Sequence, residues 1–142
     1  MSEKIDIENL KDFLDSKVEQ YNNTRFIESD PIQIPHQFNK KEDIEIASFL
    51  TATIAWGNRK SIINNAKKMM LLLDNSPYDF VTSHKESDLE ALLPFVHRTF
   101  NGEDFIQFII SLKHLYKTHN GLEAVFAKYA QEKGWEIIGV LN

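Results

Sequence analysis

The chain contains no cysteine, only five glycines and four prolines, and no long apolar run among its 142 residues. Without cysteine it can form no disulfide or thiolate metal site, and it lacks a cysteine nucleophile. The longest uncharged stretch, residues 46–58, is 13 residues long, whereas a membrane-spanning helix needs about 20 apolar residues. The N-terminal sequence MSEKIDIENL has no apolar segment after its charges, so no secretory signal is expected. We therefore predict a cytoplasmic protein that does not enter a membrane.

Hydrophobic residues make up 42% of the chain and aromatic residues 11%, which is enough to build a core at this length. The formal net charge is −5, but residues 36–72 hold six basic and three acidic side chains, whereas both flanking segments are acidic. An acidic chain is an unfavourable starting point for general nucleic-acid binding. A single basic face can still bind phosphate locally.

Apolar residues recur at the spacing of an α-helix along most of the chain, and Gly, Asn or Pro interrupts the pattern between segments. This pattern predicts an all-α fold, an orthogonal bundle of five to six helices forming one domain over residues 1–142. The helix at about 44–56 is apolar on every side, so we expect it to be buried at the centre of the bundle. Further helices are predicted at residues 7–21, 58–73, 103–119 and 122–133, with short helical turns at 76–83 and 87–93.

Two segments fall outside this pattern. Residues 22–38 contain Pro31 and Pro35, which interrupt a helix and restrict the residues before them, so we predict an extended loop there. Residues 135–142, WEIIGVLN, form an apolar tail. Either this tail packs into a groove, or the natural protein continues and residue 142 is where its core is interrupted.

The sequence Trp56-Gly57-Asn58-Arg59-Lys60 stands where the central helix is predicted to end and the next helix to begin. A helix start offers unpaired backbone N–H groups and a partial positive charge, which suit an anion. Two basic residues there oppose the helix dipole, and Trp56 can supply a face for stacking. We interpret Trp56, Asn58, Arg59 and Lys60 as candidates for binding nucleic acid or another anion. The alternative is structural, with Gly57 and Asn58 as caps, the indole in the core and the bases in solvent.

A second pattern, FVHRTFNG, covers residues 95–102. His97 and Arg98 stand in a connector between aromatic residues that can anchor it, and loops held by a rigid scaffold often carry function. An arginine beside a histidine favours the neutral imidazole, which can act as a base or acceptor. His97 and Arg98 are therefore candidates for a second contact. The alternative is that Phe95 and Phe100 fasten the loop and Asn101 caps the next helix.

The remaining patterns indicate neither a metal site nor a cofactor site. His114 and His119 are five residues apart, so they do not share a helix face as paired metal ligands would. The chain has no serine in a G-x-S-x-G turn and no glycine-rich phosphate loop. A catalytic residue cannot be assigned, because an enzyme that used His97 would need a second catalytic group.

Four segments of the sequence resemble an uncharacterised bacterial family, a conserved domain of unknown function, over residues 30–126. These segments are DPIQIPHQF, IASFLTATIAWGNRKSI, SPYDFV and FVHRTFNGEDF. That family is in turn distantly similar to the helix-hairpin-helix DNA glycosylases. The resemblance implies an incomplete fold of that kind, in which Trp56 takes the place of the side chain that enters the DNA stack. The hairpin and the catalytic residues of such enzymes lie in their second half, so no catalytic role is carried over to this chain.

These observations leave two predicted functions. The first is a nucleic-acid-associated helical domain without a complete catalytic site, and the second is a helical module for protein interaction or scaffolding. In the second, a partner or another copy of the chain would bind the face carrying Met69 and Met70 or the tail at residues 135–142.

Overall fold

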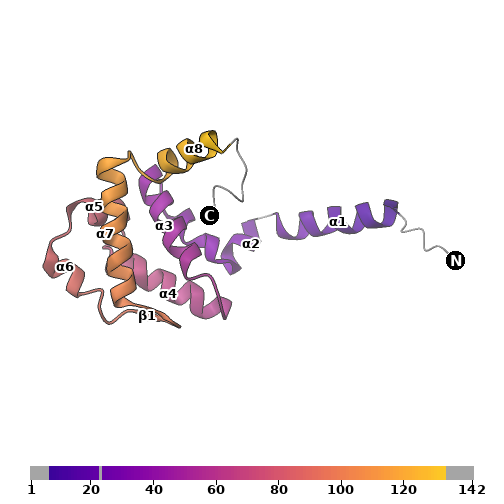
Figure 1. Ribbon diagram of the computed structural model, residues 1–142. Helices are drawn as coiled ribbons and strands as arrows, with labels where there is room; N and C mark the ends of the chain where they lie inside the picture. Colours follow the sequence, from indigo (N-terminus) through magenta and orange to yellow (C-terminus); the bar gives the residue numbers. More distant parts are fainter. Residues whose placement is uncertain (1–6, 23, 134–142) are drawn as a thin grey trace.

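The computed structural model describes residues 7–22 and 24–133, and these residues form an essentially all-α fold with one two-stranded hairpin. In chain order the elements are α1 (Ile7–Tyr21), α2 (Thr24–Ser29), η1 (Pro31–Gln33), η2 (Pro35–Gln37), α3 (Lys41–Thr53), α4 (Arg59–Leu72), α5 (Pro77–Ser83), α6 (Glu86–Glu90), β1 (Val96–His97), β2 (Phe100–Asn101), α7 (Gly102–Thr118) and α8 (Leu122–Glu132). Figure 1 shows α2 to α8 gathered in one body, with α1 projecting from it as an arm.

The central position predicted for the middle helix is confirmed. Ile46, Ala47 and Leu50 of α3 are fully buried, and α3 packs against η1, η2, α4, α5 and α8. Its predicted end at residue 56 is wrong, because α3 ends at Thr53. Thr51, Thr53 and Ile54 are β-branched residues that weaken the last turn, and the Thr53 hydroxyl binds the Phe49 carbonyl at 2.8 Å. The side of α3 that carries Ala52 is exposed.

The extended loop predicted for residues 22–38 is also wrong. The segment contains α2 and the two 3-10 turns η1 and η2. Each proline is the first residue of a 3-10 turn, where its missing N–H leaves no hydrogen bond unmade. Asp30 caps η1 by accepting a hydrogen bond from the Ile32 N–H at 2.9 Å. The prolines therefore start short helical turns that cover α3 and α4.

The hairpin and the start of α7 close the lower end of the body in Figure 1. Val96 pairs with Asn101 and His97 with Phe100 in an antiparallel register. Asn101 then caps α7, accepting a hydrogen bond from the Asp104 N–H at 3.0 Å while its own N–H donates to the Asp104 carboxylate. Gly102 is required because a Cβ there would lie 2.2 Å from the Leu93 carbonyl oxygen. This packing fixes the direction in which the hairpin leaves the body.

The methionine surface predicted for a partner is wrong. Met69 is fully buried and Met70 nearly so, and both belong to the hydrophobic core together with Leu73 and Leu112. Because both side chains are buried in the core, they offer no surface to a partner. The apolar tail at residues 135–142 lies outside the described residues.

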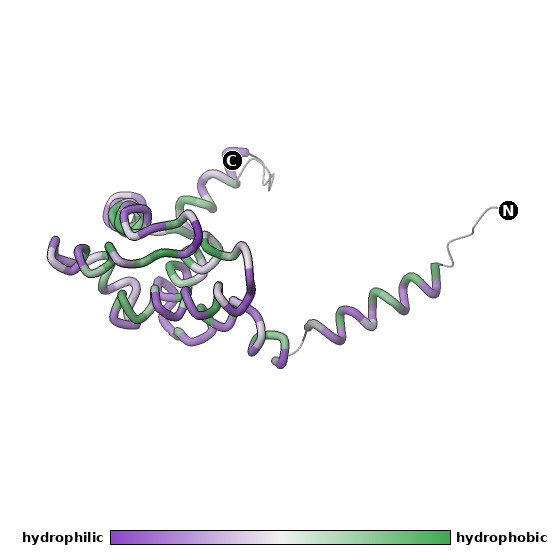
Figure 2. Tube along the Cα trace, turned by 90° about the horizontal axis from the view of Figure 1, so that it is seen from below, coloured by the Kyte–Doolittle hydropathy of each residue, from purple (hydrophilic) through white to green (hydrophobic). Residues whose placement is uncertain are grey.

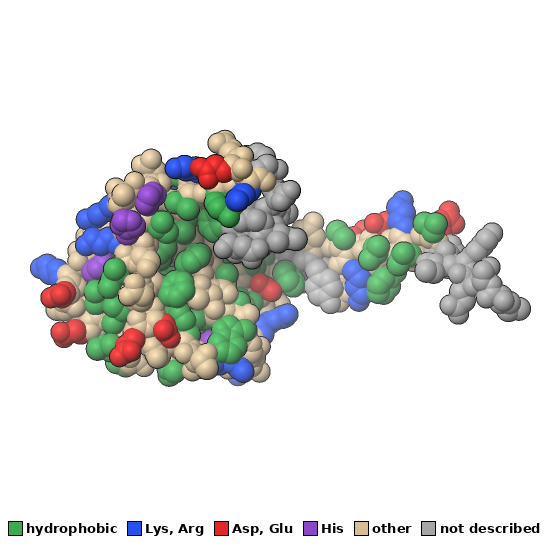
Figure 3. Space-filling view, viewed as in Figure 1, with side chains coloured by type: hydrophobic (Ala, Val, Ile, Leu, Met, Phe, Trp, Pro, Cys, Tyr) green, Lys and Arg blue, Asp and Glu red, His purple; other side chains and the backbone are tan. Residues whose placement is uncertain are grey.

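The α1 helix carries the largest exposed apolar stripe of the described residues. Figure 2 shows apolar and polar positions alternating along the arm, and Figure 3 shows green apolar side chains open to solvent on it. The stripe consists of Ile7, Leu10, Phe13, Leu14 and Val18. A helix of this pattern normally buries its apolar face, so within residues 7–22 and 24–133 the face is unpartnered.

Candidate functional site

The junction between α3 and α4 brings the first group of candidate residues to the surface. After α3, the Trp56 N–H donates to the Ile54 carbonyl at 2.8 Å, and Gly57 takes a φ of +105°, where residues with a Cβ are strained. Asn58 then caps α4 by accepting a hydrogen bond from the Ser61 N–H at 3.2 Å. The predicted cap is confirmed. Trp56 is 40% exposed, so it is not a core residue as the structural alternative required.

The first turn of α4 is basic and open to solvent. Arg59 and Lys60 are exposed, and this turn contains no acidic residue. Among residues 7–22 and 24–133, neither side chain forms an ion pair. A hollow of about 350 Å³ lies beside them, lined by Ser29, Asn58, Ile63 and Asn64 as well as by these two cations. The helix dipole and both cations therefore favour an anion in the same place.

The hairpin adds a third cation to this surface. Arg98 occupies the two-residue turn between β1 and β2 with a φ of +55°, as the first position of such tight turns requires. Its guanidinium carbon lies 4.7 Å from the centre of the Trp56 ring, within the range of a cation–π contact. A Cβ on Gly57 would lie 2.8 Å from Arg98 Nη1. Gly57 therefore provides both the backbone turn and the room for the arginine.

His97 lies beneath this surface rather than on it, because its side chain is only 2% exposed. Its Nε2 lies 3.1 Å from the Trp56 carbonyl oxygen, and its Nδ1 lies 2.7 Å from Asn65 Nδ2. Since a carbonyl can only accept, Nε2 carries the proton and donates, while Nδ1 accepts from the amide. The expectation that His97 contacts a ligand directly is wrong. It joins the hairpin to the α3–α4 junction and holds the Trp56 backbone.

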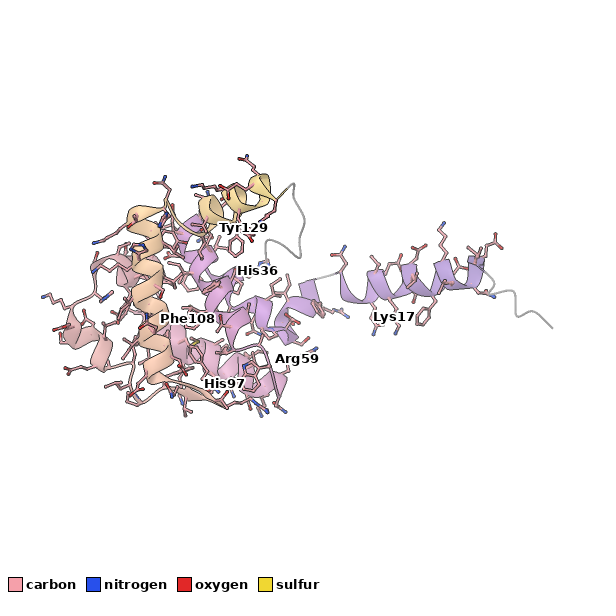
Figure 4. All side chains as sticks on the ribbon, in the orientation of Figure 1. Lys17, His36, Arg59, His97, Phe108 and Tyr129 are labelled. Carbon is pink, nitrogen blue, oxygen red and sulfur yellow. The ribbon has the colours of Figure 1, made fainter. Side chains whose placement is uncertain are left out.

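Figure 4 shows Arg59 and His97 at the same end of the body, where the start of α4 meets the hairpin. The structure thus brings all six candidate residues together, five at the surface and His97 below them. Asn65 was not predicted for this site, because its place on the polar side of the helix pattern gave no sign of a contact 32 positions away. Gly57 was predicted only as a helix stop.

A second polar cluster surrounds the start of α3. Lys41 pairs with Glu123, which raises the pKa of Lys41. The Tyr116 hydroxyl donates to Glu45 Oε2 at 2.9 Å. Burial, together with this hydrogen bond, raises the pKa of Tyr116 above its ordinary value of 10.0. Every charge named here has an opposite or hydrogen-bonding partner, so the cluster fastens α3 to α7 and α8.

The described residues contain no group of three or more His, Asp or Glu side chains that could hold a metal ion. They also contain no helix long and apolar enough to cross a membrane.

Comparison with known proteins gives one match. No curated protein and no solved structure matches the chain, so the expected likeness to helix-hairpin-helix DNA glycosylases stays a prediction. Residues 30–139 match a family described as protein of unknown function, DUF2400. The match includes α3, α4 and the hairpin and leaves α1 outside it. The chain therefore belongs to the DUF2400 family, whose function is unknown.

Proposed function

We propose that this chain binds single-stranded nucleic acid through the surface formed by Trp56, Arg98 and the first turn of α4. The observation that carries the proposal is the stacked Trp56–Arg98 pair beside two exposed cations without acidic partners in the described chain. A nucleic-acid strand presents phosphates and flat bases side by side. This surface offers a complement to both.

Phosphate binding is supported by the first turn of α4. The backbone N–H groups that open a helix have no carbonyl partner within that helix, and Asn58 satisfies only one of them. Arg59 and Lys60 stand at this turn, so a phosphate there would gain from the free amides, the dipole and two full charges. The hollow of about 350 Å³ beside them gives the phosphate a place to lie.

Base stacking is supported by the Trp56–Arg98 pair. The indole and the guanidinium are both planar, and stacking of a base on an aromatic side chain is worth about 1–3 kcal/mol. The His97 ring meets the indole edge to face, with 6.1 Å between the ring centres, and Arg98 lies over the indole, so little freedom of the Trp56 side chain is left to lose on binding. The platform is therefore formed before a ligand arrives.

The resemblance to the first half of helix-hairpin-helix glycosylases points to the same residues, because it places the stack-entering side chain at Trp56. We extend the proposal no further than binding. The polar groups of the surface act as donors, and the described residues beside it supply no paired general acid and base.

The test is binding of labelled oligonucleotides of about 15 nucleotides, followed by fluorescence anisotropy for single-stranded DNA, RNA and duplex DNA. Three cations at the surface predict that log K falls against log salt with a slope of roughly −2 for a single strand. Trp56→Ala should weaken binding about tenfold without changing that slope, since a stacking face carries no charge. A matched control is Lys117→Glu with Lys128→Glu, which alters exposed cations of α7 and α8 away from the hairpin. Absence of binding at low salt for all three nucleic acids would overturn the proposal.

The exposed stripe of α1 supports a second candidate function, self-association of the chain. Five apolar side chains on a helix of 15 residues can pair with the same helix of another copy, burying the face that the body leaves open. Sedimentation velocity over a range of concentrations tests this. Phe13→Asp should convert a dimer to a monomer, and a wild-type chain that remains monomeric at high concentration would contradict the candidate.

A further inference from the structure

A pocket of about 520 Å³ lies on the other side of Arg59, between the 3-10 turns and the exposed side of α3. This volume is in the range of small-molecule sites. The walls are mainly apolar and small, and the helix face is open because alanines stand there instead of larger residues. The apolar residues that line the pocket are Pro31, Ile32, Pro35, Ala52, Ala55 and Ile62.

Thr51 lines this pocket and has a hydroxyl that the protein does not satisfy. The side chain is 4% exposed, and within residues 7–22 and 24–133 its Oγ1 has no hydrogen-bond partner. Other hydroxyls of α3 bind the carbonyl four residues earlier, Ser48 at 2.6 Å and Thr53 at 2.8 Å. A buried hydroxyl without a partner is unfavourable, and because this oxygen is sealed from solvent, it can bond a ligand only if the side chain turns toward the pocket.

Two opposite charges also line the pocket. One oxygen of the Asp30 carboxylate accepts from the Ile32 N–H, which leaves acceptor capacity on the second oxygen. Arg59 lines both this pocket and the hollow beside the α4 start, and neither charge forms an ion pair among the described residues. The pocket thus combines a carboxylate acceptor, an apolar wall and a cation.

We propose that this pocket binds one nucleoside monophosphate. The base lies against the apolar wall with its N–H donors toward Asp30, and the phosphate lies at Arg59 near the amides of α4. The proposal rests on the proposed function insofar as Arg59 serves both sites. The nucleotide is either free or the terminal unit of a strand, since both present the same base and phosphate.

Guanosine monophosphate is the probe, because guanine presents an amino donor and an adjacent ring N–H to a carboxylate. Isothermal titration should show binding to the full chain. Ala55→Leu fills the pocket from an exposed position of the chain between α3 and α4, and it should abolish the signal while leaving the melting temperature unchanged. Asp30→Asn keeps an oxygen for the Ile32 N–H but removes the free carboxylate oxygen, so it should weaken binding about tenfold, as loss of one hydrogen bond predicts, without lowering the melting temperature.

Oligonucleotides with and without a 5′ terminal phosphate separate the two sources. Weaker binding after removal of that phosphate in the wild-type chain, but no such difference in Ala55→Leu, would show that a strand end occupies the pocket. Equal binding of both oligonucleotides, with guanosine monophosphate still bound, would assign the pocket to the free nucleotide.

The two proposals fail separately. If single strands bind through Trp56 and Lys60 but guanosine monophosphate does not bind, the pocket proposal is overturned and the proposed function stands. If the mononucleotide binds and no strand does, the proposed function fails and the pocket stands. Binding of leucine in place of the nucleotide would also overturn the pocket proposal, because an amino acid offers its ammonium to Asp30 and its carboxylate to Arg59.

Discussion

The starts of α3 and α4 each carry two adjacent cations, but these cations have different surroundings. Lys40 and Lys41 open α3, and each faces an acid, Asp79 at 3.8 Å for Lys40 and Glu123 for Lys41. Arg59 and Lys60 open α4 without an acid in the first turn and without an ion pair among the described residues. One pair of cations connects helices, while the other has no acidic partner among the described residues. The sequence shows part of this difference, because Glu42 and Asp43 follow the cations of α3 and no acid stands in the first turn of α4.

The largest effect is expected when the two cations at the start of α4 are replaced by acids. Arg59→Glu with Lys60→Glu should weaken single-strand binding about 100-fold, since loss of each phosphate contact costs about tenfold, and should reduce the salt slope from roughly −2 to roughly −0.7. Lys40→Glu with Lys41→Glu makes the same change in net charge at the other helix start. Anisotropy titrations should show nearly unchanged binding for that variant. Equal losses in both variants would mean that binding follows net charge rather than the α4 surface.

The next effect concerns the backbone that shapes the surface. Gly57→Ala introduces a Cβ at a φ of +105° and 2.8 Å from Arg98 Nη1, so it should cost about 1–2 kcal/mol of stability. It should also weaken binding, because Arg98 has to leave the indole. Urea denaturation measures the first effect and anisotropy the second. The double variant Gly57→Ala with Arg98→Ala should regain part of the stability, since the side-chain clash is removed while the backbone strain remains.

A smaller effect is expected at the α3 cluster and concerns stability alone. Tyr116→Phe removes the hydrogen bond to Glu45 and should cost about 1 kcal/mol at neutral pH. The raised folded-state pKa of Tyr116 means that its stabilisation is complete below the unfolded pKa of 10.0 and is lost as the pH rises above it. The difference in the free energy of unfolding between wild type and variant, measured by urea titration, should therefore become smaller above pH 10. Strand binding at neutral pH should not change.

The smallest effect is on thermal stability and comes from the interaction of residue 59 with the dipole of α4. Arg59→Glu alone should raise the thermal stability by about 0.5 kcal/mol, because it places an acid in the first turn of α4. Lys41→Glu should lower stability, since it faces Glu123 with a like charge. Thermal melts of the two single variants, in the same buffer at low salt, give the comparison. A loss of stability in Arg59→Glu would indicate that Arg59 has a structural partner.

The helices could be predicted from the sequence because their apolar residues recur with the helical period over several turns. The period predicts α1, α4 and α7 to within a residue or two of their ends. It failed at residues 22–38, where proline was interpreted as a breaker and instead starts the two 3-10 turns. It failed again at the end of α3, where the apolar pattern continues to residue 56 although the backbone leaves the helix after Thr53.

The site could be predicted only in part, because its residues are held together by contacts that the sequence spacing does not show. Four of the candidates lie within the single segment 56–60, and the helix cap and the charges in this segment follow from the physics of a helix start. These candidates are Trp56, Asn58, Arg59 and Lys60. The contact between Trp56 and Arg98 depends on the hairpin and spans 42 positions. Likewise, the sequence gives no sign that His97 is buried under the indole or that Thr51 has no partner, since both depend on how α3, α4 and the hairpin pack.

The close approach of Gly57 to the arginine in the hairpin turn has a consequence for inheritance. Residue 57 cannot change freely by itself, because its φ of +105° strains any residue with a Cβ and that Cβ would lie 2.8 Å from Arg98 Nη1. Among members of the family, a residue larger than glycine at the junction should therefore coincide with one shorter than arginine in the turn. A substitution at residue 57 would then be accompanied by a substitution at residue 98, although the two positions are far apart in the sequence.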